Sequence, residues 1–136
     1  MSDIQTIYSD HAPDPIGPYS QAKRFGDLVF TAGQIGLDSE GKLAQGVADQ
    51  THQAVANLRA VLQAGGARLE SVLKTTIFLA DMNDFARVNE VYAQYFGDSS
   101  PARSTVEAAR LPKDALVEIE AIAIVPLLRN SSEVRS

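Results

Sequence analysis

Apolar residues recur with the spacing of a helix in two segments of the chain. The first segment, residues 47–64, is followed by Gly65-Gly66, and glycine is common just past the end of a helix. The second begins at Asn83 or Asp84, either of which can cap a first turn. Two amphipathic helices are therefore predicted. Their stripes consist of Val47, Thr51, Ala54, Val55, Leu58, Val61 and Leu62 in the first helix, and of Phe85, Val88, Val91 or Tyr92, Tyr95 and Phe96 in the second.

The other apolar segments have the composition or the alternation of β-strands. Residues 72–80 are rich in β-branched and apolar types, which is typical of a buried strand. Residues 20–25 and 28–34 flank Gly26-Asp27, a pair suited to a tight hairpin turn. Further strands are predicted at residues 3–8, 103–109 and 115–125. The order β-β-β-α-β-α-β-β predicts an α+β domain, a single sheet with two helices on one face.

The last predicted strand is largely apolar on both of its faces. Its residues divide between the two faces as Val117, Ile119, Ala121 and Ala123 on one, and Leu116, Glu118, Glu120, Ile122 and Ile124 on the other. The chain supplies only two helices, which cover one side of the sheet. The second side is therefore expected to be buried against further copies of the chain, and we predict a homo-oligomer.

Composition narrows the class of protein without indicating a chemistry. A chain of 136 residues suits one domain, here 1–126, followed by a polar tail at 127–136. The formal net charge is −5 and the twelve Lys and Arg residues are scattered, which argues against a nucleic-acid surface. Cysteine is absent and no signal pattern or membrane-spanning run is found, so we expect a cytoplasmic protein without a membrane partner. His11 and His52 are too far apart to indicate a metal site; His52 is expected on a solvated helix surface, and no metal or cofactor is expected.

Charged residues interrupt the predicted strand at 103–109. Arg103 and Glu107 share one face of this strand with Thr105. A guanidinium at a strand entry can hold a carboxylate through two parallel charge-assisted hydrogen bonds. The alternative is an internal ion pair with Glu107, Glu118 or Glu120, and spacing alone slightly favours the ion pair.

Glu118 and Glu120 form a second charged feature, on one face of the last strand and roughly 7 Å apart. Two carboxylates this close can separate their pKa values and leave one of them a better proton carrier. The alternative is a solvated strand face, which the flanking Leu116 and Ile122 disfavour. A symmetric hairpin does not place Arg103 opposite Glu118, so either a bulge shifts the register or the two residues meet across a subunit interface.

Two further polar residues are candidates for a pocket. Tyr19 follows a loop with prolines at positions 13, 15 and 18, which fix the backbone and can present the ring in a defined direction. The ring is equally suited to covering a pocket or to packing on the core. Asn89 lies among apolar helix positions and suits either a polar pocket contact or an exposed helix surface.

Several ordered motifs then give the chain a recognisable pattern from Ile16 to Ala123. The motifs are Ile16-Gly17-Pro18-Tyr19-Ser20-Gln21, Thr31-Ala32-Gly33-Gln34-Ile35, Lys74-Thr75-Thr76-Ile77-Phe78-Leu79, Asn83-Asp84-Phe85, Val88-Asn89, Pro101-Ala102-Arg103-Ser104, Arg110-Leu111-Pro112-Lys113-Asp114 and Val117-Glu118-Ile119-Glu120-Ala121. In this order they closely resemble the RidA (YjgF) family of reactive-intermediate deaminases. The resemblance implies a chorismate-mutase-like fold and a homotrimer with sites in the clefts between subunits. It also implies hydrolysis of 2-imino acids or their enamine tautomers, formed by pyridoxal-phosphate-dependent dehydratases, to 2-keto acids and ammonia.

The resemblance also implies roles for individual residues. Arg103 matches the family's carboxylate-binding arginine and Glu118 its water-positioning glutamate, which leaves Glu120 structural. Tyr19, Gly33 and Asn89 match other pocket positions.

Two positions depart from the family pattern. Thr105 stands where many members carry cysteine, which excludes a thiol role but keeps a small polar group for substrate binding. Ala32 stands where members often have serine, so the exact imine or enamine, 3-aminoacrylate included, stays open. Other classes of function also stay open, namely a non-catalytic module that binds a small carboxylate and regulates a partner, and an endoribonuclease or translation inhibitor.

Overall fold

One mixed β-sheet and two helices make up the fold, in the α+β order that the sequence predicts. The computed structural model describes residues 3–127. Its elements are β1 (Gln5–Ile7), β2 (Ala22–Phe25), β3 (Leu28–Thr31), α1 (Gly46–Ala64), β4 (Val72–Leu79), α2 (Phe85–Phe96), β5 (Ala102–Glu107) and β6 (Val117–Ile124), with 3₁₀ turns at Leu69–Ser71, Met82–Asp84 and Pro112–Asp114. Of the predicted tail at 127–136, residues 128–136 lie outside the described residues.

The last strand of the chain lies inside the sheet. The strand order is β1-β2-β3-β6-β4-β5, and among the strands of residues 3–127 only the pair β4 and β5 is parallel. These two strands run parallel because α2 connects them as a crossover. Strand β4 therefore separates β5 from β6, and the predicted strands around 103–109 and 115–125 do not form a hairpin with each other.

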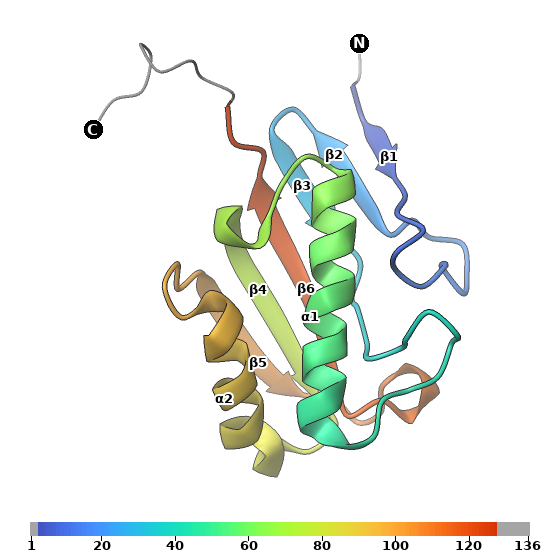
Figure 1. Ribbon diagram of the computed structural model, residues 1–136, viewed down its shortest axis with the longest axis vertical. Coiled ribbons are helices and arrows are strands. Elements are labelled where there is room, and N and C mark those ends of the chain that lie inside the picture. Colours follow the sequence, from blue (N-terminus) through green and yellow to red (C-terminus); the bar gives the residue numbers. More distant parts are fainter. Residues whose placement is uncertain (1–2, 128–136) are drawn as a thin grey trace.

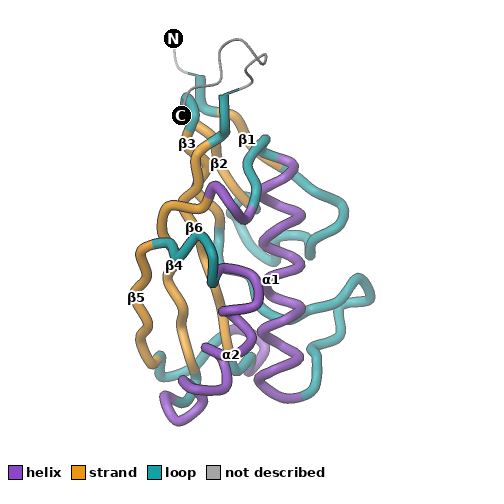
Figure 2. The backbone as a smooth tube through the Cα atoms, turned by 60° about the vertical axis from the view of Figure 1, so that its left-hand side comes forward, coloured by secondary structure: helices purple, strands orange, loops and turns teal. Residues whose placement is uncertain are grey.

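Both helices lie on the same side of the sheet, as Figures 1 and 2 show. The residues of β6 that face them are Val117, Ile119, Ala121 and Ala123, each at most 3% exposed. The opposite face carries no helix among the described residues. Its apolar side chains remain partly open to solvent, with Phe30 43% and Ile124 41% exposed. The predicted division of the sheet into a covered and an uncovered face is therefore confirmed.

Helix α1 buries the predicted stripe except for Val47, which is only partly buried, and it also buries two polar residues that the pattern did not single out. The side-chain amide of Asn57 donates hydrogen bonds to the backbone oxygens of Ile35 at 3.0 Å and Leu37 at 2.9 Å. Gln50 accepts a hydrogen bond of 2.8 Å from the backbone N–H of Leu116 through its Oε1. These side chains satisfy backbone groups of the segment after β3 and of the residue just before β6, and so they tie both segments to α1.

Helix α2 differs from its prediction at its beginning. Asp84 occupies the position before the helix but makes no capping bond; instead Asp81 accepts a hydrogen bond of 2.9 Å from the N–H of Asn83. Phe85, predicted to be a core residue, is 38% exposed. The helix is preceded by a 3₁₀ turn, and its first residue lies at the rim of the core.

The expectation for His52 is corrected by the fold. Its Nδ1 lies 2.6 Å from the hydroxyl oxygen of Tyr95, and the two rings meet edge to face. This histidine therefore joins α1 to α2 and is partly buried, whereas His11 is exposed as expected. Within residues 3–127, neither helix is long and apolar enough to span a membrane.

Candidate active site

Glu118 projects from β6 on the face of the sheet that no helix covers. Its neighbour Ile119 faces the core and is bridged to Gln34 by two backbone hydrogen bonds, of 2.8 and 3.0 Å. The bridge lies beyond the end of β3, so the predicted strand 28–34 is interrupted after Thr31 and pairing resumes at residue 34. As a result, Gly33 lies directly against the side chain of Glu118.

The Glu118 carboxyl group fills the space that a side chain at position 33 would take. A Cβ atom on Gly33 would lie 2.7 Å from Cδ and 2.8 Å from Cγ of Glu118, and would also collide with Oε2. Gly33 is not among the glycines with a positive φ. Glycine is therefore needed here for close approach and not for an unusual backbone conformation.

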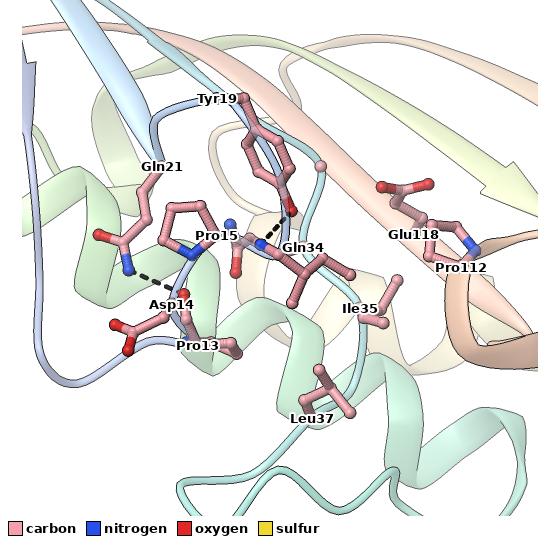
Figure 3. Close-up of a pocket in the computed structure, with 12 residues that line it drawn as sticks. Pro13, Asp14, Pro15, Tyr19, Gln21, Gln34, Ile35, Leu37, Pro112 and Glu118 are labelled. Carbon is pink, nitrogen blue, oxygen red and sulfur yellow. Dashed lines mark hydrogen bonds between the residues drawn. The ribbon is translucent and has the colours of Figure 1, made fainter.

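Glu118 and Tyr19 line the same small pocket, shown in Figure 3. The space inside it is about 50 Å³, and a water molecule needs about 10–15 Å³ of such space, so the pocket has room for a few waters beside the carboxylate. Pro112 and Ile35 contribute apolar walls. Tyr19 is 51% exposed, and its hydroxyl accepts a hydrogen bond of 3.4 Å from the N–H of Ile16.

The loop that carries Tyr19 is held by Gln21, a residue that the sequence reasoning missed. Gln21 is buried, and its Nε2 donates to the backbone oxygen of Ser9 at 3.0 Å. The same Nε2 donates to the backbone oxygen of Pro13 at 2.9 Å (Figure 3). Its Oε1 accepts a 2.6 Å hydrogen bond from the N–H of Ser9. Prolines remove amide donors from this loop, and the Gln21 side chain supplies them instead. The only available signal was its position at the end of the Ile16–Gln21 motif.

The surroundings of Glu118 raise its pKa above the ordinary value of a glutamate. The larger cause is burial, which disfavours the charged form, and the second is the negative charge of Glu120. Within the described part of the chain, the Glu118 carboxylate makes no ion pair and accepts no hydrogen bond. Its oxygens are therefore available to accept a proton from an incoming molecule.

Arg103 lies on the other face of the sheet. It pairs in register with Thr75 of β4, which is fully buried, so Arg103 points to the side of the helices. No carboxylate of residues 3–127 lies within 4 Å of its guanidinium, and the internal ion pair that spacing slightly favoured is wrong. Glu107, one of the suggested partners, accepts a 2.7 Å hydrogen bond from the N–H of Met82.

Two other predicted pocket residues lie on the Arg103 side. Asn89 and Arg103 line a shallow pocket between α2 and the start of β5. Thr105 lies two residues after Arg103 and therefore on the same face of β5. It pairs in register with Ile77 of β4, a core residue, just as Arg103 pairs with Thr75. Its Oγ1 is buried and has no hydrogen-bond partner in the described chain. Such orphaned polar atoms are uncommon in folded proteins, and each calls for a physical explanation.

The predicted site residues thus form two separate clusters. Tyr19, Gly33 and Glu118 lie together on the uncovered side of the sheet, and we call them the glutamate cluster. Arg103, with Asn89 in its pocket and Thr105 beside it on the same face, forms the arginine cluster on the helix side. Within one chain the sheet itself stands between the two clusters. Residues 3–127 hold no group of three or more His, Cys, Asp or Glu side chains that could bind a metal ion.

The structure is thus a two-layer α+β domain in which, among residues 3–127, Arg103 on one side of the sheet and the half-buried Glu118 on the other have no ion-pair partner. A guanidinium without an internal partner is a group that can bind a small carboxylate. The chain belongs to the Endoribonuclease L-PSP family, which is the YjgF/RidA family, because the model of that family matches residues 9–125. The resemblance seen in the motifs is confirmed.

Three relatives are similar to this chain over nearly their whole length. A RutC family protein of Pyrococcus horikoshii is 54% identical over 121 residues, which are 88% of this chain and 96% of the relative. The 2-iminobutanoate/2-iminopropanoate deaminase of Salmonella typhimurium is 45% identical over 88% of this chain and 97% of its own. Among solved structures, TdcF of E. coli with bound serine has a TM-score of 0.84 at 43% identity, over 88% of this chain and 98% of TdcF.

Proposed function

We propose that the chain hydrolyses 2-imino acids, or their enamine tautomers, to 2-keto acids and ammonia, with 2-iminobutanoate and 2-iminopropanoate as substrates. The observation that carries the proposal is the half-buried guanidinium of Arg103, which has no carboxylate partner in the described chain. A substrate carboxylate is the partner that such a fork binds best. Deaminases of this name from Salmonella typhimurium and Homo sapiens, each 45% identical, support the reaction. A cytoplasmic location, beside the pyridoxal-phosphate enzymes that would release the substrate, is part of the same proposal.

The two clusters are proposed to meet between subunits of a homotrimer. Arg103 lies on β5, an edge strand, whereas Glu118 lies on the uncovered face in the middle of the sheet. Contact between such different surfaces of two copies is a head-to-tail contact, which forms a ring such as a trimer when its rotation closes, whereas a two-fold dimer pairs the same surface of both copies. The exposed apolar side chains Phe30 and Ile124 support burial of that face.

The proposed reaction uses one binding group and one proton carrier. Arg103 binds the substrate carboxylate, and the buried Thr105 hydroxyl gains a partner in the same ligand. Glu118 accepts a proton from a water molecule while the water oxygen bonds to C2 of the imine. As the water adds, the C2–N π electrons move to nitrogen, which takes this proton from Glu118 and gives a neutral carbinolamine. Glu118 then carries the proton of the carbinolamine hydroxyl to the same nitrogen, the C2–N bond breaks, and ammonia leaves as the C2–O bond becomes a carbonyl. Tyr19 covers the pocket. The raised pKa of Glu118 brings it closer to neutral pH, where a general base is most effective.

The proposal is tested with the purified protein and a threonine dehydratase that releases 2-iminobutanoate, in the presence of semicarbazide as a trap. We expect the protein to lower the yield of semicarbazone by converting the imine first. An unchanged yield would contradict the proposal, and binding of 2-oxobutanoate without turnover would then indicate a regulatory module. RNA cleavage that persists through further purification would favour a ribonuclease. Light scattering tests the trimer separately.

Substitution of Gly33 by alanine is expected to lower kcat/KM by about 100-fold, because the new methyl group displaces the Glu118 carboxylate and misplacement by about 1 Å costs about that factor. The matched control is Gly17→Ala, in the loop of Tyr19. Its Cβ would meet the Tyr19 ring at an ordinary 3.5 Å, so activity should stay within a few-fold of wild type. Wild-type activity in Gly33→Ala would show that the Glu118 position is not critical.

The pH profile of kcat/KM is expected to follow the ionisation of Glu118. Its pKa is raised, so the acid limb should lie at higher pH than for an ordinary glutamate. Glu120 is the second cause of the raised pKa, and removing its negative charge favours ionisation of Glu118. Glu120→Gln should therefore move the acid limb to lower pH. Asp114→Asn, which removes an exposed carboxylate paired with Arg110, should leave the limb in place. A limb that does not respond to Glu120→Gln would mean that another group controls the profile.

A further inference from the structure

Two aromatic rings of α2 lie against the guanidinium of Arg103. Its Cζ is 4.9 Å from the centre of the Tyr92 ring and 5.5 Å from the centre of the Phe85 ring. Both distances fall within the range of about 6 Å over which a ring attracts a cation. Phe85 and Tyr92 are seven residues apart, which places them on one face of the helix, two turns from each other. We call this pair the aromatic platform.

The Tyr92 ring is locked in place from the core side. Its hydroxyl oxygen lies 2.6 Å from Oγ1 of Thr75, which is fully buried and pairs in register with Arg103. The ring also packs against Phe96 with their centres 4.6 Å apart. Strand β4, through Thr75, therefore pairs with Arg103 and also anchors the Tyr92 ring that Arg103 contacts. Phe85 has no such anchor and forms the exposed part of the platform.

An aromatic support has a different consequence for Arg103 than an ion pair. A carboxylate would accept the N–H groups of the guanidinium, which are the same donors that a ligand carboxylate needs. The face of a ring attracts the positive charge and leaves those in-plane donors available. Rings also limit the rotamers of a long side chain, so less conformational freedom is lost when a ligand binds.

We propose that Phe85 and Tyr92 are positioning residues, which hold the Arg103 guanidinium in the orientation that receives the carboxylate of the ligand. The identity of that ligand rests on the proposed function. The carboxylate does not react, so its binding is the same in the ground state and the transition state. Loss of the platform should therefore raise KM and leave kcat unchanged.

The first test replaces the exposed ring, because Phe85→Leu keeps an apolar side chain and leaves the core intact. We expect KM for 2-iminobutanoate to rise by about 2- to 5-fold, the factor that an exposed cation–π contact provides. Phe85→Tyr should retain the wild-type KM. The matched control is Tyr95→Leu, on the same helix, whose ring lies 5.7 Å from Arg59 and lines neither pocket of the two clusters. This control should not change KM.

The second test asks whether the platform acts through Arg103. In the Arg103→Ala background, Phe85→Leu should cause no further change in the Kd of 2-oxobutanoate, measured by calorimetry. Tyr92→Phe, which keeps the ring, should retain the wild-type Kd, whereas Tyr92→Leu should weaken binding by about 5- to 30-fold. An unchanged Kd in Phe85→Leu, or an equal loss with and without Arg103, would overturn the proposal. Because this measurement needs no turnover, a protein that binds 2-oxobutanoate but leaves the imine intact would contradict the proposed function alone.

Discussion

Replacement of Arg103 by alanine is expected to lower kcat/KM for 2-iminobutanoate by about 100-fold or more. The substitution removes two charge-assisted hydrogen bonds to the substrate carboxylate, and each bond to a charged group contributes about 1.5–3 kcal/mol. Arg103→Lys keeps the charge but cannot present two parallel donors, so an activity about 10-fold below wild type is expected. Competition with semicarbazide in the dehydratase-coupled assay measures both variants.

The matched control for this prediction is Arg59→Ala. Arg59 also lies over a tyrosine ring, at 5.7 Å from the Tyr95 centre, but it lines neither pocket of the two clusters. Its loss should leave imine clearance at the wild-type level. Arg103 has no ion-pair partner among the described residues, so Arg103→Ala should fold and melt close to wild type. Imine clearance at the wild-type rate in Arg103→Ala would remove this residue from the binding site.

Replacement of Glu118 by glutamine is expected to lower kcat by about 100- to 10,000-fold, the usual contribution of a positioned general acid or base. Glutamine has nearly the same shape and can still bind water, but it cannot take a proton from it. KM should change much less than kcat because the substrate carboxylate is bound by Arg103. Steady-state rates over a range of imine supply separate the two constants.

The same substitution is expected to stabilise the fold at pH 7. Burial and Glu120 raise the pKa of Glu118 in the folded chain above its unfolded value, so the folded state disfavours the carboxylate form. This destabilisation is fully present at pH values above the pKa of Glu118 in the folded chain. It vanishes at pH values below the pKa of Glu118 in the unfolded chain. Glu118→Gln should thus have a higher free energy of unfolding than wild type at pH 7, and the gain should disappear in acid.

The control for Glu118 is its neighbour on the same strand face. Glu120→Gln removes a carboxylate two residues away but leaves the proton carrier, so kcat should stay within about 10-fold of wild type. A comparable loss of kcat in both variants would assign the chemistry to the pair and not to Glu118. A stable but fully active Glu118→Gln would exclude Glu118 as the base.

The sequence predicted most elements correctly because their signals are local. The α1 stripe, the Gly26-Asp27 turn and the alternation of β6 each depend on residues within one element, and the structure has them as predicted. Phe85 and His52 were predicted wrongly, because their surroundings come from other elements. Phe85 obeys the helical period of the core residues but lies at the rim, against Arg103.

The sequence by itself determined the fold class, the uncovered apolar face and, through its ordered motifs, the membership in the YjgF/RidA family. Only the tertiary structure decided that β4 separates β5 from β6, that Arg103 and Glu118 point to opposite sides of the sheet, and that Gly33 leaves room for the Glu118 carboxyl group. The physical reason is the range of the interactions. Period and composition set which faces of one element are apolar, whereas strand order, register and close approach depend on contacts between residues far apart in the chain.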